Sequence, residues 1–192
     1  MKSEYKNFTR NRNAIRLAFA DLMLKYGDIN KITIMEIVKV AQISRGTFYS
    51  HYKSIDEVIL DIGKEFGEKL KILLEKYNTE NYLINSLPYF EELHDFLNKN
   101  KELYIKLLQA GQGPVISQYI KTAVYSSMYE MPILRDQYID QERFKFDLNF
   151  FVSGSVQVVL DNLVDSNLQI NRDRVVNMVN NKFIDIFVNS RK

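Results

Sequence analysis

The chain has 192 residues and no cysteine, which excludes disulfides, thiolate zinc sites and cysteine nucleophiles. The net charge is only +2, but residues 1–60 carry +4 and the remainder −2, which favours a basic module for a polyanion joined to a second module. The N-terminus is polar and no apolar run reaches about 18 residues, so we expect no signal peptide, no membrane span and a cytoplasmic location.

Apolar residues at three-to-four spacing, with only seven glycines and three prolines, predict an all-α fold. The first helix ends at Gly27, and Thr33 with Glu36 has the spacing of a capping box at the start of the second. Ser44 and Ser54 are suitable N-caps for the third and fourth helices. About nine helices are expected, over residues 11–26, 34–40, 45–51, 55–77, 82–98, 100–109, 114–130, 141–165 and 172–189.

Polar or Gly- and Pro-containing stretches separate the later helices. These breaks are expected at residues 78–81, 98–100, 111–114, 131–132 and 166–167. Pro88, early in the fifth predicted helix, indicates that this helix bends or begins late.

Residues 33–54 have the pattern of a helix-turn-helix, two short helices joined by a tight turn. The second helix begins with residues small or polar enough to lie deep in a major groove, namely Ser44, Arg45, Gly46 and Thr47. Arg45 can reach guanine acceptors or a phosphate, and the Thr47 methyl group can contact a thymine methyl. Tyr49 and Lys53 lie where they can bind backbone phosphates. A compact helical subdomain that does not bind DNA can have the same spacing, so spacing alone leaves both interpretations open.

Residues from about Phe8 to Leu70 resemble the N-terminal domain of the tetracycline-repressor-like (TetR) family of transcriptional regulators. The matching segments, in order, are Ala14–Gly27, Thr33–Ile37, Ile43–Tyr49 and His51–Ser54. The resemblance implies an all-helical dimer that recognises DNA through residues 44–50 and a C-terminal domain that responds to an effector. The family usually has glycine where Gln42 stands, so Gln42 must accept a left-handed or adjusted backbone at a cost of about 1 kcal/mol or more.

The C-terminal half resembles a TetR subgroup that includes dihydroxyacetone-kinase-operon regulators. The resemblance rests on Phe150–Gly154, on Leu160, Leu163 and Val164, and on Asn167–Ile170. That subgroup often has a tryptophan near Asn162, whereas this chain has none, so no ligand is carried over.

We therefore expect a helix-turn-helix domain at residues 8–54, extended by the fourth helix to about residue 70, and an effector-binding and dimerisation domain at residues 55–192. The predicted function is a sequence-specific DNA-binding regulator, a repressor rather than an enzyme, that binds a palindromic operator as a homodimer and responds to a small molecule. The alternative is a helical ligand- or partner-binding protein of the same fold that does not bind DNA. The predicted DNA-binding residues are Thr33, Ser44, Arg45, Gly46, Thr47, Tyr49, Ser50, His51 and Lys53.

Four residues are candidates for binding the effector: His94, Tyr119, Thr122 and Tyr125. The last three share one face of the seventh predicted helix, where they either line an apolar cavity with hydroxyl groups or simply fill the core. Dimerisation is expected through the last two helices, because they carry more apolar residues than one buried face needs. These residues include Phe151, Val158, Val159, Leu163, Val176, Val179, Phe183 and Phe187.

No cofactor and no metal are expected. Glu91 and His94 have the spacing of half a di-iron site, but the sequence lacks the second half. Two histidines without cysteine do not make an ordinary transition-metal site. The stretch 111–114 contains a G-x-G without a preceding strand or a GK[ST] ending, and is interpreted as a connection between helices.

Overall fold

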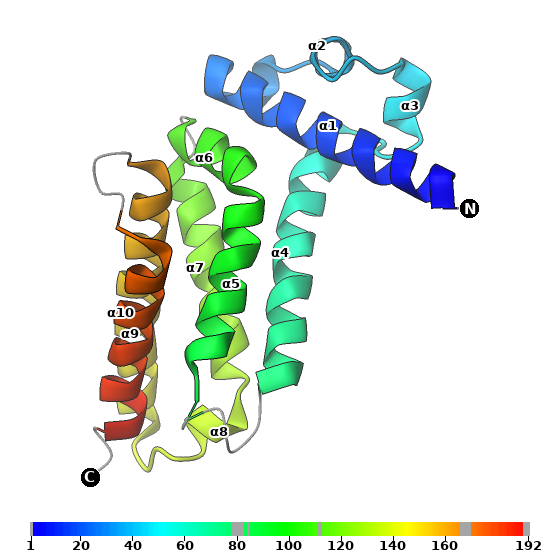
Figure 1. The fold of residues 1–192 in the computed structure, drawn as a ribbon. Helices are drawn as coiled ribbons and strands as arrows, with labels where there is room; N and C mark the ends of the chain where they lie inside the picture. The colour runs from blue at the N-terminus through cyan, green and yellow to red at the C-terminus, as the bar shows by residue number, and fades with distance from the viewer. Residues whose placement is uncertain (1, 78–82, 84, 111–112, 166–169, 190–192) are drawn as a thin grey trace. The chain divides into compact units, whose positions relative to one another are not determined.

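The structure is a computed structural model, and it describes residues 2–77, 83, 85–110, 113–165 and 170–189 (Figure 1). These residues form ten α-helices, one 3-10 turn and one π-helical turn, with no strand among them, which confirms the all-α fold. The elements are α1 Lys2–Tyr26, η1 Ile29–Lys31, α2 Ile34–Val40, α3 Arg45–Tyr49, α4 Ile55–Tyr77, α5 Leu87–Lys99, α6 Lys101–Gln109, α7 Gly113–Tyr129, α8 Pro132–Arg135, α9 Gln141–Val164, α10 Arg172–Ile184 and η4 Asp185–Asn189. The breaks predicted at residues 78–81 and 166–167 lie outside the described residues. Of the break predicted at residues 111–114, residues 111–112 also lie outside them, whereas Gly113 and Pro114 already belong to α7.

Several boundaries differ from the expected ones. α1 begins at Lys2 rather than near residue 11, because its first turns contain no proline or glycine although their apolar periodicity is weak. α8 was not predicted, and it begins at Pro132, within the break expected at residues 131–132. α5 begins only at Leu87, with Pro88 in its first turn. This agrees with the late start that Pro88 indicated. The last predicted helix ends at Ile184 and continues as the π-helical turn η4.

The chain divides into two compact units. The first comprises residues 1–66 and 101–116, and the second comprises residues 67–100 and 117–192. α4 therefore contributes its first half to one unit and its second half to the other, while α6 belongs with the N-terminal helices. The boundary predicted after residue 54, between a DNA-binding and an effector-binding domain, concerns function rather than packing. It stays a prediction.

In the first unit, α1 packs against α2 and α6 (Figure 1). Apolar side chains from four helices are fully buried between them, namely Ile15, Phe19, Ile37, Phe48 and Val58. Burial of each such side chain contributes about 1.5–3 kcal/mol before the entropy of ordering the chain is subtracted. Lys106 of α6 adds an ion pair with Asp21 of α1 at 2.8 Å.

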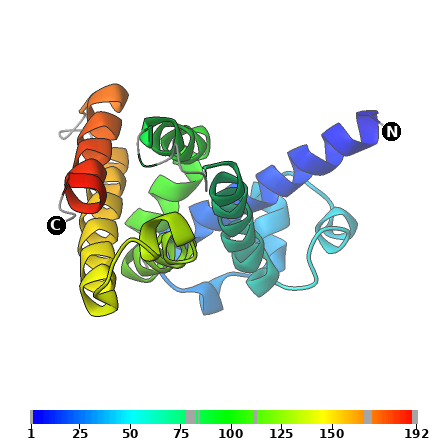
Figure 2. The same ribbon diagram turned by 90° about the horizontal axis from the view of Figure 1, so that it is seen from below.

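In the second unit, a cluster of aromatic rings joins α5, α9, α10 and η4. Phe183 lies 5.4 Å from Phe90, 5.8 Å from Phe151 and 5.1 Å from Phe187, measured between ring centroids. The tilted and edge-on geometries suit the quadrupoles of the rings. α9 and α10 lie side by side in both views and run in opposite directions (Figures 1 and 2).

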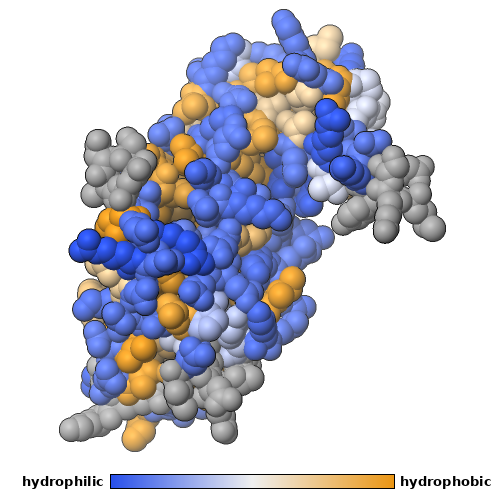
Figure 3. Space-filling model, in the orientation of Figure 1, coloured by the Kyte–Doolittle hydropathy of each residue, from blue (hydrophilic) through white to orange (hydrophobic). Residues whose placement is uncertain are grey.

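On the face seen in Figure 3, hydrophilic residues dominate and hydrophobic residues form small patches between them. Within the described ranges, no helix is both long and apolar enough to cross a bilayer. The same residues include no group of three or more His, Cys, Asp or Glu side chains placed to hold a metal ion.

Candidate nucleic-acid interface and ligand groove

The start of α2 is fixed by the predicted capping box. The Thr33 hydroxyl accepts a hydrogen bond from the Glu36 backbone N–H at 3.3 Å, and the Glu36 carboxylate accepts one from the Thr33 backbone N–H at 3.0 Å. Tyr26 of α1 also donates to Glu36 at 2.5 Å. The hydrogen bond from Tyr26, followed by those from Thr33, lowers the pKa of Glu36. Thr33 is thus held in place by α2 itself, and its contact with DNA stays a prediction.

The turn between α2 and α3 requires a left-handed backbone. Gln42 has a φ of 54°, the only positive φ of a non-glycine residue in the described part of the chain. The Ile43 N–H then donates back to the Val38 carbonyl at 3.1 Å, which closes the turn. The expectation that Gln42 accepts the conformation usual for glycine is confirmed.

The N-terminal turn of α3 is organised by hydroxyl groups. The Ser44 hydroxyl accepts a hydrogen bond from the Thr47 N–H at 3.0 Å and lies 2.9 Å from the Thr47 hydroxyl. The Ser50 hydroxyl donates to the Thr47 carbonyl at 2.7 Å. Each hydroxyl oxygen can still make a further hydrogen bond, so these groups are held in position without being saturated.

α3 presents a cationic surface whose charges are not neutralised. Its Phe48 is fully buried, whereas Arg45 and Gly46 are exposed and Tyr49 is 54% exposed. No carboxylate of the described residues lies within ion-pair distance of Arg45 or of the exposed Lys53, which precedes α4 by two residues. A surface of this kind attracts a polyanion such as the phosphate backbone of DNA.

His51 occupies a different environment from the other predicted DNA-binding residues. Its ring lies against Phe8 of α1, with 4.1 Å between ring centroids, and it is half-buried. Burial, followed by the charge of Arg12, lowers its pKa, so the imidazole is neutral at neutral pH. The structure therefore places His51 where it supports α1, and a direct role at DNA stays a prediction.

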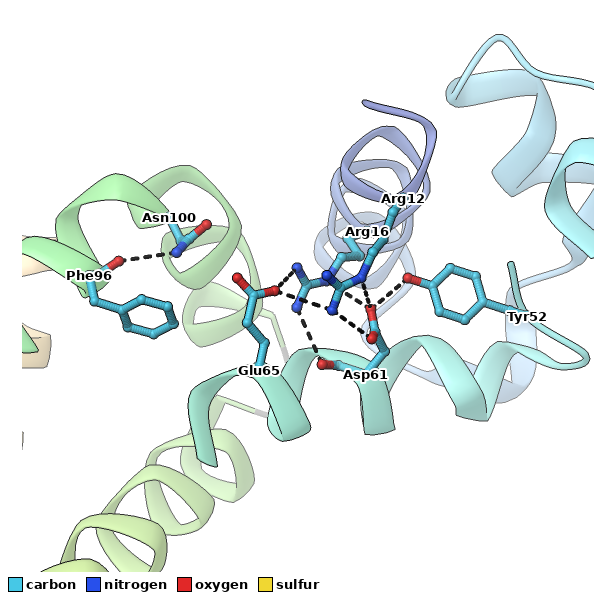
Figure 4. A network of polar contacts seen from close by, with 7 residues as sticks. All are labelled: Arg12, Arg16, Tyr52, Asp61, Glu65, Phe96 and Asn100. Atoms are coloured by element: carbon cyan, nitrogen blue, oxygen red, sulfur yellow. Dashed lines mark hydrogen bonds and ion pairs between the residues drawn. The ribbon is translucent and has the colours of Figure 1, made fainter. Parts of the chain in front are cut away.

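A network of ion pairs and hydrogen bonds that joins α1, Tyr52 and α4 was not predicted (Figure 4). Arg12 of α1 donates two hydrogen bonds to Asp61 of α4, at 2.8 and 2.7 Å, and Tyr52 donates to the same carboxylate at 2.6 Å. Arg16, only 4% exposed, pairs with Glu65 and lies 3.4 Å from Asp61. Burial alone would raise the pKa of Asp61, but the hydrogen bonds from Arg12 and Tyr52 outweigh it and the pKa is lowered. The i, i+4 spacing of the arginines on α1 and of the carboxylates on α4 was the only signal in the sequence.

In the second unit, a groove of about 510 Å³ lies between α7 and α9. Two of the four predicted ligand residues, Thr122 and Tyr125, line it. Tyr119 is 55% exposed and is not part of the lining. His94 lies on α5, outside the groove, with its Nδ1 atom 3.9 Å from Asp95. The groove residues that were not predicted are Gln118, Lys121, Lys145, Phe146, Asn149, Val152 and Ser153.

The apolar residues named for the dimer interface fall mostly in the core. Phe151, Val176, Val179, Phe183 and Phe187 are each at most 8% exposed, so they are not available to a partner. That part of the prediction is wrong, because the three phenylalanines belong to the aromatic cluster of the second unit and the two valines are buried in the core. Val158 is 45% exposed, and the large apolar residues that α9 actually presents are Phe146 and Phe150, at 70% and 66%.

Comparisons with known proteins place the chain among regulators. A family profile described as "Transcriptional regulator C-terminal region" (TetR_C_8) matches residues 85–181, about half of the chain. No match was found among the curated proteins.

Solved structures share the fold over nearly the whole length. The dihydroxyacetone kinase operon activator DhaS is 16% identical, with a TM-score of 0.56 over 95% of this chain and 98% of that one. A TetR transcriptional regulator from Streptococcus agalactiae is 18% identical, with a TM-score of 0.54 over 97% of this chain and 98% of that one. The match over residues 85–181, together with this shared fold, shows that the chain belongs to the TetR family of transcriptional regulators.

Proposed function

We propose that the chain binds operator DNA through its helix-turn-helix and regulates transcription in response to a small molecule. Residues 8–54, extended by α4 to about residue 70, form the DNA-binding domain, and residues 55–192 bind the effector and dimerise. The observation that carries the proposal is the surface of α3 and the start of α4, where Arg45 and Lys53 are exposed and have no carboxylate partner among the described residues. The alternative is a protein of this fold that does not bind DNA. In such a protein, nothing requires these two cations to stay unpaired.

The predicted residues divide the work according to their positions. Arg45 and Thr47 at the start of α3 read base edges, and Tyr49 and Lys53 further along hold phosphates. Five further residues complete the surface, by capping a helix, by leaving room for the edge of the DNA groove or by supporting α1. They are Thr33, Ser44, Gly46, Ser50 and His51. A carbon added at Gly46 would meet only the Ser44 hydroxyl, at 3.7 Å, so the surface there is open.

The proposed homodimer forms through α9 and α10. Phe146 and Phe150 expose large rings on α9, and Gly154 next to them has no atom within 4 Å of the position of a β-carbon. Such a face suits close packing against a second copy. A symmetric dimer sets its two recognition helices about 34–36 Å apart, one turn of DNA, and so requires a palindromic operator.

The dimer is tested by Phe150→Glu, which places a charge on this face without touching the core. Sedimentation should show a monomer, and operator affinity should fall because one half-site alone is weakly bound. A variant that remains dimeric would contradict the assignment of this face. Lys99→Glu on α5, outside α9 and α10, is an exposed control for the introduced charge.

We propose repression as the direction of regulation, by occupation of an operator that overlaps a promoter. The neighbour DhaS is named an activator, so the direction needs its own test. A promoter fused to a reporter should be less active with the wild-type chain than with Arg45→Ala. Higher activity with the wild-type chain would reverse the direction while leaving DNA binding in place.

The decisive experiment measures the affinity of each variant for a selected operator and for random DNA across a salt series. Arg45→Ala should cost about 1–3 kcal/mol per half-site and relax the preference at one base pair. Lys53→Ala should weaken both DNAs alike and reduce the slope of log K against log salt by about one per lost phosphate contact, doubled in a dimer. Lys71→Ala, an exposed lysine in the other half of α4, is the matched control and should change neither. If neither headpiece variant mattered, the alternative without DNA binding would be the better one.

A further inference from the structure

The groove between α7 and α9 has the size of a small-molecule site. Its volume of about 510 Å³ falls within the roughly 300–1,000 Å³ typical of such sites. α7 contributes Lys121, Thr122 and Tyr125, and α9 contributes Lys145 and Phe146. The two walls therefore bring cationic, hydroxyl and aromatic groups together.

The charge of the groove is positive and not compensated locally. No carboxylate is among the described residues that line it. The Lys121 ammonium donates to the neutral Oε1 atom of Gln157 at 2.8 Å, and Lys145 is exposed with no carboxylate of the described chain within 4.0 Å. By contrast, Lys69 of the same unit pairs with Glu92 at 3.5 Å. Two ammonium groups without carboxylate partners at one groove favour an anionic occupant.

A chain of hydrogen bonds positions one of these cations. The Gln157 side-chain amide donates to Asp161 at 2.8 Å, which turns its oxygen toward Lys121. Asp161 thus binds the amide rather than the ammonium group, and it does not line the groove. Lys121 is held at the groove while keeping hydrogen bonds to offer, since an ammonium group has three donors.

Each wall also contributes an aromatic ring supported by a second ring. Tyr125 stacks on Tyr129 with 6.0 Å between centroids and 12° between planes. Phe146 stacks on Phe150 at 6.5 Å and 15°, and is 70% exposed. Val152, only 2% exposed, adds an apolar contact to the lining. An exposed ring on one wall and a half-buried ring on the other favour an occupant with an apolar, flat body.

We propose that the groove binds a planar small-molecule anion, a ring compound bearing a carboxylate or sulfonate group. Lys121 and Lys145 bind the anionic group, and Tyr125 and Phe146 contact the ring. This assignment rests on the proposed function, because it names the chemical class of the effector. Phe146 also belongs to the α9 face assigned to dimerisation, so a ligand on it can bias the spacing of the two recognition helices.

The test uses two fluorescent probes that share one ring system. 1-Anilinonaphthalene-8-sulfonate carries the anionic group, and N-phenyl-1-naphthylamine lacks it. Lys121→Gln and Lys145→Gln should each weaken binding of the sulfonate by up to about fivefold, the size of a partly exposed ion pair. Neither change should affect the neutral probe. Lys99→Gln, an exposed lysine of α5 outside the groove, is the matched control.

A second variant tests the location independently of charge. Ser153→Trp fills the groove from α9, where Ser153 is exposed, and should abolish binding of both probes without unfolding the chain. Sulfonate binding that survives both this variant and a variant carrying Lys121→Gln together with Lys145→Gln would overturn the assignment. So would dissociation of the dimer by Ser153→Trp, because the groove would then be covered by a second copy of the chain.

Operator affinity measured in the same preparations separates the two proposals. Saturating sulfonate should shift the operator affinity of the wild-type chain, and no shift would overturn the effector role of the groove. If the operator binds but the probes do not, only the groove assignment falls. If the probes bind in the groove but no DNA binds, the proposed function falls and the anion site remains.

Discussion

The two units of the molecule are stabilised by different kinds of contact. The first unit joins α1 to α4 through Arg12, Arg16, Asp61 and Glu65 (Figure 4). The second unit joins its helices through aromatic rings centred on Phe183. Ring packing tolerates small shifts, whereas a paired guanidinium and carboxylate fix distance and direction at once. The polar network thus fixes the orientation of α1 against α4, whereas the aromatic cluster contributes mainly the burial of apolar area.

The largest effect is expected from the aromatic cluster. Phe183→Ala removes a fully buried ring that touches three others, and should lower the free energy of unfolding by about 3–5 kcal/mol. Denaturant unfolding followed by circular dichroism measures the change. Tyr119→Ala, at a site 55% exposed, is the matched aromatic control and should stay within about 0.5 kcal/mol.

Equal losses for the two variants would mean that the ring cluster is not the main source of stability in the second unit. Hydrogen exchange sharpens the comparison, because protection should fall first in α5, α9 and α10. Protection lost equally in α1 and α2 would show that the two units unfold as one.

A smaller effect is expected from the polar network. Asp61→Asn keeps the shape but removes the charge that Arg12, Arg16 and Tyr52 face, and should cost about 1–3 kcal/mol. The cost is below that of a fully buried pair because the Asp61 side chain is 22% exposed. Glu75→Gln, which loses only an exposed pair with Lys71 at 4.0 Å, is the control and should change little.

The same variant has a characteristic dependence on pH. The pKa of Asp61 in the folded chain lies below its ordinary value of 3.8, so its contribution is complete above that value and is lost as the pH falls through the lower one. The difference in stability between wild type and Asp61→Asn should therefore be constant from pH 7 to about pH 5 and shrink below about pH 4. A difference that grew on acidification would contradict the ion-pair account.

Features that depend on neighbours in the sequence were predictable. Helix ends were predicted from the pair Thr33 and Glu36, from Ser44 and from Gly27. They were predictable because the hydrogen bonds and dihedral angles of these residues involve only the next few residues. The same holds for the left-handed backbone at Gln42. The fold class followed from such local signals and from helical periodicity.

Features that depend on partners far along the chain were not predictable. Arg12 and Asp61 are 49 residues apart, and nothing local links them. Periodicity places Tyr119, Thr122 and Tyr125 on one helix face but does not show that α9 covers only part of it. The last two helices do carry many apolar residues. Which of these residues face the core depends on how α5 packs against α10.

The smallest effect tests whether the turn between α2 and α3 stores strain. Gln42 is exposed and has a φ of 54°, a conformation that costs a side-chain-bearing residue about 1–2 kcal/mol. Gln42→Gly removes this cost, but glycine loses more entropy on folding, by about 0.5–1 kcal/mol. The balance should raise the free energy of unfolding by about 0.5–1 kcal/mol. Gln42→Ala is the matched control, because it removes the same side chain and keeps the β-carbon, and it should give no gain.

The two variants should bind operator DNA as the wild type does, because the turn already has the geometry that glycine permits. A gain shared by both would mean that the glutamine side chain, rather than the backbone, carries the cost. A loss with Gln42→Gly would mean that the turn is not strained and that the extra freedom of the unfolded chain dominates. In either case the effect should be largest in the hydrogen exchange of α2 and α3, since the backbone hydrogen bonds of the turn run from Gln42 to Lys39 and from Ile43 to Val38.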